Sequence, residues 1–105
     1  MNKELMYVIA NTDTNNLMDQ MIEECAELIQ ACTKVKRSLR GDASIQADAA
    51  YGMLVEEMAD VLNVQRVTAD RVLTSAERAR MEEIKDQKMQ RWAERIRNKR
   101  GKDGE

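Results

Sequence analysis

Apolar side chains recur at helical spacing in the first third of the chain. Asp13 or Thr14 is a suitable N-cap for a helix that follows. The pattern ends at Arg40-Gly41-Asp42, where Gly41 suits a C-cap. The spacing i, i+3, i+4, i+7 therefore predicts an amphipathic helix between these points. Its apolar stripe comprises Leu17, Met18, Met21, Cys25, Leu28, Ile29, Cys32, Val35 and Leu39.

Two further helices are predicted downstream. The second extends to Leu73, but Gly52 weakens its beginning, so we expect residues 43–52 to be irregular or frayed. Thr74 and Glu77 form a capping box that starts a third helix. The second stripe contains Tyr51, Leu54, Val55, Met58, Val61, Leu62 and Gln65, and the third contains Met81, Ile84, the stem of Lys88, Met89, Trp92 and Ile96.

The two ends of the chain are less defined by pattern. Residues 3–10 are mostly apolar and fit either a short helix or an arm that packs on the body. The tail from Arg97 is charged and contains glycine, so we expect it to be loose. The prediction is an all-α fold with one domain over residues 1–97 and a flexible charged tail over 98–105. Three main helices close a core poorly, so we expect a four-helix-bundle-like core completed by the N-terminal segment or, preferably, by a second chain.

Composition narrows the function. The 105 residues include no proline, four glycines and three aromatic residues, which favours long helices. Histidine is absent, which excludes catalysis and metal sites that need imidazole. A net charge of −2 argues against nucleic-acid binding. No apolar run approaches the roughly 20 residues of a membrane span, and the N-terminus does not resemble a signal peptide, so we expect a cytoplasmic protein without a membrane partner.

The two cysteines predict no disulfide. Cys25 and Cys32 lie seven residues apart on one predicted helix, which separates them by about 10.5 Å along its axis. A disulfide tolerates a Cα separation of only about 7 Å. We interpret both as small buried apolar side chains.

An acidic cassette occurs twice. Residues 23–30 (EECAELIQ) and 56–63 (EEMADVLN) match at every position, identically or by a conservative change. If Cys25 and Met58 are the centres of their stripes, an i, i+3 carboxylate pair lies on the flank of each stripe. Antiparallel packing would bring the two flanks together. The four converging carboxylates would be Glu24, Glu27, Glu57 and Asp60.

Four carboxylates in one place repel one another and need a cation. Oxygen ligands suit Mg²⁺, with Mn²⁺ as a substitute, whereas di-iron bundles use Glu-x-x-His pairs that this chain lacks. Magnesium held by a few carboxylates keeps positions for water and phosphates, which points to phosphate chemistry. The alternative is an ordinary solvated acidic face.

These motifs resemble a known family. EExxE followed by ExxD on a second helix is similar to the MazG-like, all-α nucleoside triphosphate pyrophosphohydrolases, especially the short single-domain members. The resemblance covers roughly residues 14–97 and includes the basic stretches 34–41 and 88–96. It implies hydrolysis of nucleoside triphosphates to the monophosphate and pyrophosphate by a homo-oligomer, a dimer or a tetramer. It also implies that Glu24, Glu27, Glu57 and Asp60 bind the metal, and that Glu23, beside Glu24, acts on the attacking water.

Basic residues are candidates for binding the triphosphate. Lys34, Lys36, Arg37 and Arg40 form one group, and Lys88, Arg91 and Arg95 share a face of the last helix. We hypothesise that one or both groups contact the β- and γ-phosphates; the alternative is that they complement helix dipoles and solubilise the surface.

Large aromatic rings are few in the predicted helical body. Tyr51 and Trp92 could stack on a base, although we expect them to pack in the core. Two other functions remain open. One is a non-catalytic helical interaction module that binds a partner through a methionine-rich face, since the chain contains eight methionines. The other is a nucleotide- or metal-binding sensor.

Overall fold

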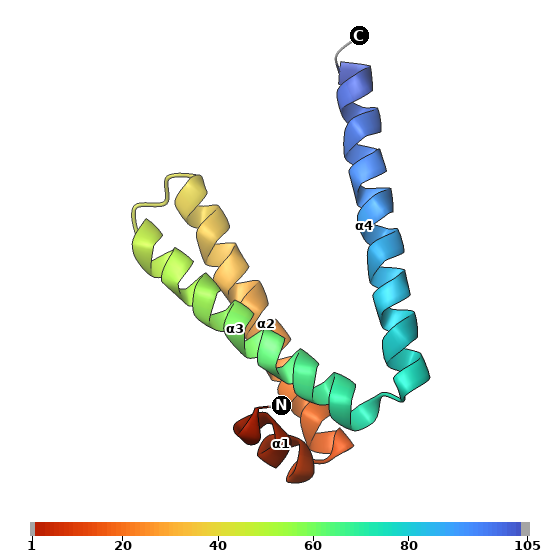
Figure 1. Ribbon diagram of the computed structural model, residues 1–105. Helices are drawn as coiled ribbons and strands as arrows, with labels where there is room; N and C mark the ends of the chain where they lie inside the picture. The colour runs from red at the N-terminus through yellow and green to blue at the C-terminus, as the bar shows by residue number, and fades with distance from the viewer. Residues whose placement is uncertain (1, 104–105) are drawn as a thin grey trace. The chain divides into compact units, whose positions relative to one another are not determined.

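The computed structural model describes residues 2–103 and contains four helices over that range (Figure 1). They are α1 (Lys3–Ala10), α2 (Thr14–Leu39), α3 (Ala47–Val72) and α4 (Ser75–Asp103). The described residues include no strand, so the all-α prediction is confirmed. The N-terminal segment is a short helix that packs on the body, which decides between the alternatives that the sequence left open. No helix in this range is both long enough and apolar enough to cross a bilayer.

Side-chain caps determine where the first helices begin. The Asn2 side chain accepts hydrogen bonds from the Glu4 and Leu5 backbone amides at 2.8 and 3.2 Å, which caps α1. Asp13 accepts from the Asn16 amide at 2.8 Å and caps α2, as predicted. Gly41 has φ +84° just after α2, a left-handed conformation that glycine adopts without strain.

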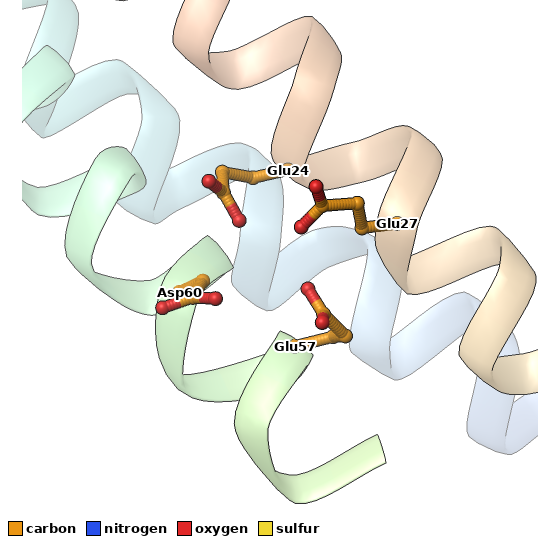
Figure 2. Close-up of side chains that lie close together, drawn as sticks. All are labelled: Glu24, Glu27, Glu57 and Asp60. Atoms are coloured by element: carbon orange, nitrogen blue, oxygen red, sulfur yellow. The ribbon is translucent and has the colours of Figure 1, made fainter. Parts of the chain in front are cut away.

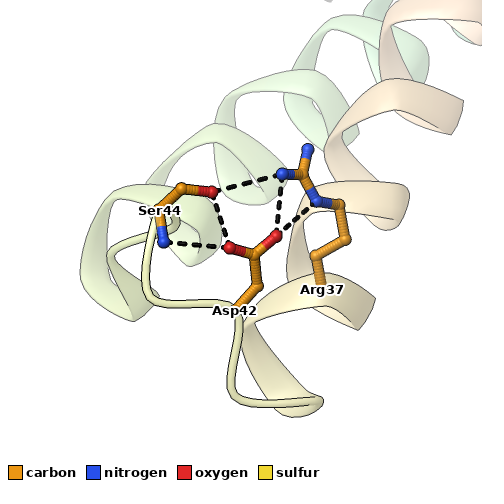
Figure 3. Close-up of polar contacts among 3 residues, drawn as sticks. All are labelled: Arg37, Asp42 and Ser44. Atoms are coloured by element: carbon orange, nitrogen blue, oxygen red, sulfur yellow. Dashed lines mark hydrogen bonds and ion pairs between the residues drawn. The ribbon is translucent and has the colours of Figure 1, made fainter.

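The loop between α2 and α3 is held by a small polar network (Figure 3). The Arg37 guanidinium contacts Asp42 at 2.8 Å and donates to the Ser44 hydroxyl at 3.2 Å. Asp42 also accepts hydrogen bonds from the backbone amide and the hydroxyl of Ser44. These bonds from Ser44 and Arg37 lower the Asp42 pKa to about 2. The network closes the hairpin over residues 40–46. Residues 47–52, which we expected to be frayed, belong to α3.

Helices α2 and α3 lie side by side along their length, and α1 contacts α3 (Figure 1). The buried core is small and consists of Leu17, Ala31, Ala50, Val64 and Val67. Leu5 and Ile9 of α1 pack against part of it.

One long-range hydrogen bond fixes the chain between α1 and α2. Arg71 donates its Nε proton to the Thr12 carbonyl at 3.0 Å, across 59 positions of sequence. The bond links the α1–α2 turn to the end of α3, so the three helices form one unit.

The predicted apolar stripes form the core only in part, since Leu17 is buried and Met21 packs against it. Met58, which we took as the centre of its stripe, is 51% exposed, and Leu62, Ile29 and Leu39 are 65–71% exposed. The reason is that the seam between α2 and α3 runs along small and acidic residues, such as Ala31, Ala50 and the carboxylates. Met58, Leu62, Ile29 and Leu39 are turned away from this seam and are not covered by residues 2–103.

The two cysteines are also less buried than the sequence predicted. Both are free thiols, which confirms that no disulfide forms. Their predicted burial is wrong, because Cys32 is exposed and Cys25 is half-buried.

Helix α4 belongs to a second compact unit. The chain divides into Met1–Val72 and Leu73–Glu105, whereas the sequence suggested a boundary at residues 97 and 98. The Thr74 amide and hydroxyl exchange hydrogen bonds with Glu77, which confirms the capping box. The expected loose tail is wrong for residues 98–103, which are helical; residues 104 and 105 lie outside the described part.

The aromatic side chains were also placed incorrectly. Trp92 is 56% exposed and Tyr51 is 46% exposed, so neither packs in a core formed by residues 2–103. The third predicted stripe is exposed in the same way, at Met81, Met89 and Ile96. In α4 the apolar residues are interspersed with charged ones, and these exposed side chains are not covered by residues 73–103.

Candidate functional site

Four carboxylates converge in the seam between α2 and α3. Glu24 and Glu27 extend from α2, Glu57 and Asp60 extend from α3, and the four groups point toward one another (Figure 2). One oxygen from each lies within 4.8 Å of the others. The sequence predicted this convergence, although it placed the carboxylates on the flank of a buried stripe and not in the seam.

The spacing of the cassette explains the convergence. Residues three apart on a helix lie on nearly the same face, so each helix offers two carboxylates one turn apart. Close approach of the backbones is permitted because the seam also contains Ala31 and Ala50, which are 0% and 2% exposed. Small residues in the seam thus leave room for acidic ones.

Mutual repulsion and partial burial raise the pKa of two of these groups. Removal from water raises the pKa of Glu24, and the charges of Asp60 and Glu27 raise it further, against a hydrogen bond from Gln20 that lowers it. For Glu27, the Glu57 carboxyl is the main cause, because it can share a proton with Glu27 and repels it when both are charged. The cluster therefore favours an added positive charge, whether a proton or a metal ion.

Two oxygens of the cluster have no hydrogen-bond donor. The Oε2 atoms of Glu24 and Glu57 are covered by protein and lack a partner among residues 2–103. The other oxygen of Glu24 accepts from the Gln20 amide at 2.9 Å. A covered carboxylate oxygen without a donor is costly unless something binds it. The donor set, all oxygen and all anionic, suits a hard divalent cation such as Mg²⁺.

Glu23 lies outside the cluster. Its side chain is exposed, and its charge contributes to raising the pKa of both Glu24 and Glu27. Its predicted action on the attacking water stays a prediction.

The predicted phosphate-binding residues fall in two places. Arg37 is engaged by Asp42 and Ser44 in the hairpin loop (Figure 3). Lys88, Arg91 and Arg95 are exposed on α4. Their contact with a substrate stays a prediction.

A cleft beside the cluster was not predicted from the sequence. It has a volume of about 610 Å³, lies among α1, α2 and α3, and has Glu24 and Asp60 in its wall. The buried side chains of Leu17, Val64 and Val67 also line it. Three amide side chains, Asn16, Gln20 and Asn63, provide hydrogen-bonding groups there. The one feature of the sequence that pointed to this cleft was the short apolar segment 3–10. No local pattern determines where that segment packs against the other helices.

The molecule was compared with protein families, curated proteins and solved structures, and none of the three comparisons gives a match.

Proposed function

We propose that this chain hydrolyses nucleoside or deoxynucleoside triphosphates to the monophosphate and pyrophosphate, with Mg²⁺ as cofactor and Mn²⁺ as a substitute. The observation that carries the proposal is the convergence of Glu24, Glu27, Glu57 and Asp60 within 4.8 Å, with two covered oxygens lacking donors. The resemblance of the duplicated acidic motif to MazG-like pyrophosphohydrolases supplies the reaction.

The four carboxylates are the ligands we assign to the metal. When bound, Mg²⁺ neutralises phosphate charge and lowers the pKa of a coordinated water. The carboxylates hold their positions through the α2–α3 seam, and Gln20 fixes one oxygen of Glu24. Glu23, on the exposed side of the same helix turn, is the residue we assign to orient the attacking water or to take its proton.

The reaction needs no side-chain nucleophile. The oxygen of water forms a bond to the α-phosphorus, and the bond from that phosphorus to the α–β bridging oxygen breaks. The hydroxyl stays with the monophosphate, pyrophosphate takes the bridging oxygen and its electron pair, and the remaining proton passes to a base or to solvent. This route requires neither a histidine nor a disulfide, which agrees with a sequence that contains no histidine and with two cysteines that are free thiols.

A homo-oligomer, either a dimer or a tetramer, is part of the proposal. Ile22, Ile29, Val55, Met58 and Leu62 are each more than half exposed, on the sides of α2 and α3 away from their shared seam. Several large apolar side chains exposed on adjacent helices are typical of protein interaction surfaces. The same surface supports the rival function, a non-catalytic helical interaction module, so the assay must separate the two.

The test is a panel of ribo- and deoxyribonucleoside triphosphates incubated with the purified protein and Mg²⁺, with EDTA as control. Chromatography separates pyrophosphate from orthophosphate. We expect pyrophosphate and monophosphate in equal amounts, lost in EDTA and lost in Glu57→Gln. Glu56→Gln is the matched control, because Glu56 precedes Glu57 but is exposed and outside the cluster.

Two outcomes contradict the proposal. Absence of turnover with every nucleotide would favour the interaction module or, if metal still binds, the sensor. Turnover that persists in Glu57→Gln would place the metal elsewhere.

A further inference from the structure

The site has two different ends along the α2–α3 hairpin. On one side of the carboxylates lies the cleft beside α1, because Asn16 and Gln20 precede Glu24 on α2 and Asn63 follows Asp60 on α3. The opposite side is occupied by Lys34, which lies two turns after Glu27. We ask which part of a substrate each end suits.

The cleft suits an uncharged, partly apolar group. Its wall combines the buried apolar side chains of Leu17, Val64 and Val67 with amides that can both donate and accept. The cation in the wall, Arg66, is already paired with Asp70 at 2.8 Å. Its volume of about 610 Å³ lies within the range of small-molecule sites. A base and a sugar meet this description better than a polyphosphate does.

Lys34 suits an anion. Lys34 is a half-buried residue, and its ammonium lies 3.6 Å from the Met53 sulfur, which is its hydrogen-bonding partner within residues 2–103. A thioether is a weak acceptor, so the cation lacks a strong one. Met53 stands one turn before Glu57 on α3, which places the ammonium at the hairpin-loop end of the carboxylate cluster. Unlike Arg37, which is bound to Asp42, Lys34 has no carboxylate partner in the described part of the chain.

We propose that the substrate lies along the seam in one direction, with its nucleoside in the cleft beside α1 and its β- and γ-phosphates at Lys34. The inference rests on the proposed hydrolysis, since it places the α–β bond over the carboxylates between the two ends. Lys34 then holds the pyrophosphate that leaves, and Asn63 contacts the nucleoside that stays with the α-phosphate. Arg71, through its bond to the Thr12 carbonyl, keeps the α1 side of the cleft in place.

Product inhibition tests the direction, because each product retains the contacts of one end. Inhibition constants for pyrophosphate and for the nucleoside monophosphate are measured in the Mg²⁺ turnover assay, using the best nucleotide of the panel. We expect Lys34→Met to weaken inhibition by pyrophosphate about tenfold or more and to leave inhibition by the monophosphate unchanged. Lys34→Arg, which keeps the positive charge, should retain most of the inhibition by pyrophosphate.

The cleft gives the reciprocal result. Asn63→Ala should weaken inhibition by the monophosphate several-fold and leave inhibition by pyrophosphate unchanged. Lys99→Met and Asn15→Ala are the matched controls, because both side chains are exposed, neither lines the cleft and neither belongs to a basic group assigned to the phosphates. Circular dichroism melting curves identify any variant that fails to fold, and Lys34→Gln then replaces Lys34→Met, or Asn63→Asp replaces Asn63→Ala.

The experiment distinguishes failure of the proposed hydrolysis from failure of the proposed substrate direction. If the wild-type protein releases no pyrophosphate, the proposed function fails and the direction fails with it. If the wild type is active but Lys34→Met weakens both products equally, weakens the monophosphate alone or changes neither, the direction is wrong and the hydrolase assignment stands.

Discussion

The acidic cluster makes a prediction about stability that does not depend on catalysis. Adding Mg²⁺ to EDTA-treated protein should raise the Tm of the unit formed by Met1–Val72, because the ion binds the folded cluster and not the separated carboxylates of the unfolded chain. At a hundredfold excess over Kd, mass action stabilises the folded state by about 2.7 kcal/mol. For a unit of this size that corresponds to roughly 10–20 °C in Tm.

The net charge of the cluster indicates which variant tests the metal site. The four carboxylates carry −4 when ionised, and one divalent ion leaves −2. Glu27→Gln removes one ligand and one charge, so its Tm in EDTA should exceed that of the wild type, while its response to Mg²⁺ should be much smaller. Glu56→Gln removes an exposed charge outside the cluster and should behave as the wild type in both respects.

The pH dependence has a definite sign. Because the pKa values of Glu24 and Glu27 are raised in the folded state above the ordinary value of 4.5, protonation favours folding. The destabilisation is present above the folded pKa values and is relieved as the pH falls through them toward 4.5. In EDTA, the Tm should therefore rise on mild acidification from pH 7, whereas the Mg²⁺ shift should shrink because protons compete for the ligands.

Differential scanning fluorimetry or calorimetry measures all of these quantities. A wild-type Tm that does not change when Mg²⁺ or Mn²⁺ is added would refute the assignment of the cluster as a metal site. A Mg²⁺-induced rise in Tm that is as large in Glu27→Gln as in the wild type would refute it as well.

Three other predictions concern the loop, the cap and the exposed surface. Asp42→Asn should lower the Tm at pH 7, and it should remove the stability that the wild type loses as the pH falls below 3.8 toward the Asp42 pKa of about 2; equal acid profiles of the two proteins by circular dichroism would contradict this. Thr74→Ala should cost about 1 kcal/mol at the start of α4, seen as faster amide exchange at residues 75–78, and unchanged exchange would show that the cap is dispensable. Trp92 is the single tryptophan and is 56% exposed, and we predict that the oligomer covers it in addition to the exposed sides of α2 and α3, so its emission should shift to the blue as protein concentration rises; an emission maximum that stays constant while sedimentation shows association would place the interface away from Trp92.

Local sequence determined the helices and the acidic cluster. The caps at Asp13 and Thr74, the left-handed Gly41 and the spacing of apolar residues act over a few positions, so the ends of α2 and the start of α4 could be predicted without tertiary information. The convergence of the carboxylates followed from a repeat on two helices joined by a short loop. Each of these features depends on interactions within a turn or a hairpin.

Tertiary structure decided which face of each helix is buried. Periodicity identifies an apolar stripe, but it does not say what covers that stripe, and here the seam runs along Ala31, Ala50 and the carboxylates while Met58 and Leu62 remain exposed. The cleft beside α1 and the isolated ammonium of Lys34 depend on the same choice of face, because both arise from residues on different helices. A one-dimensional pattern fixes the angle of a side chain around its own helix, whereas the packing of helix against helix fixes what that side chain meets.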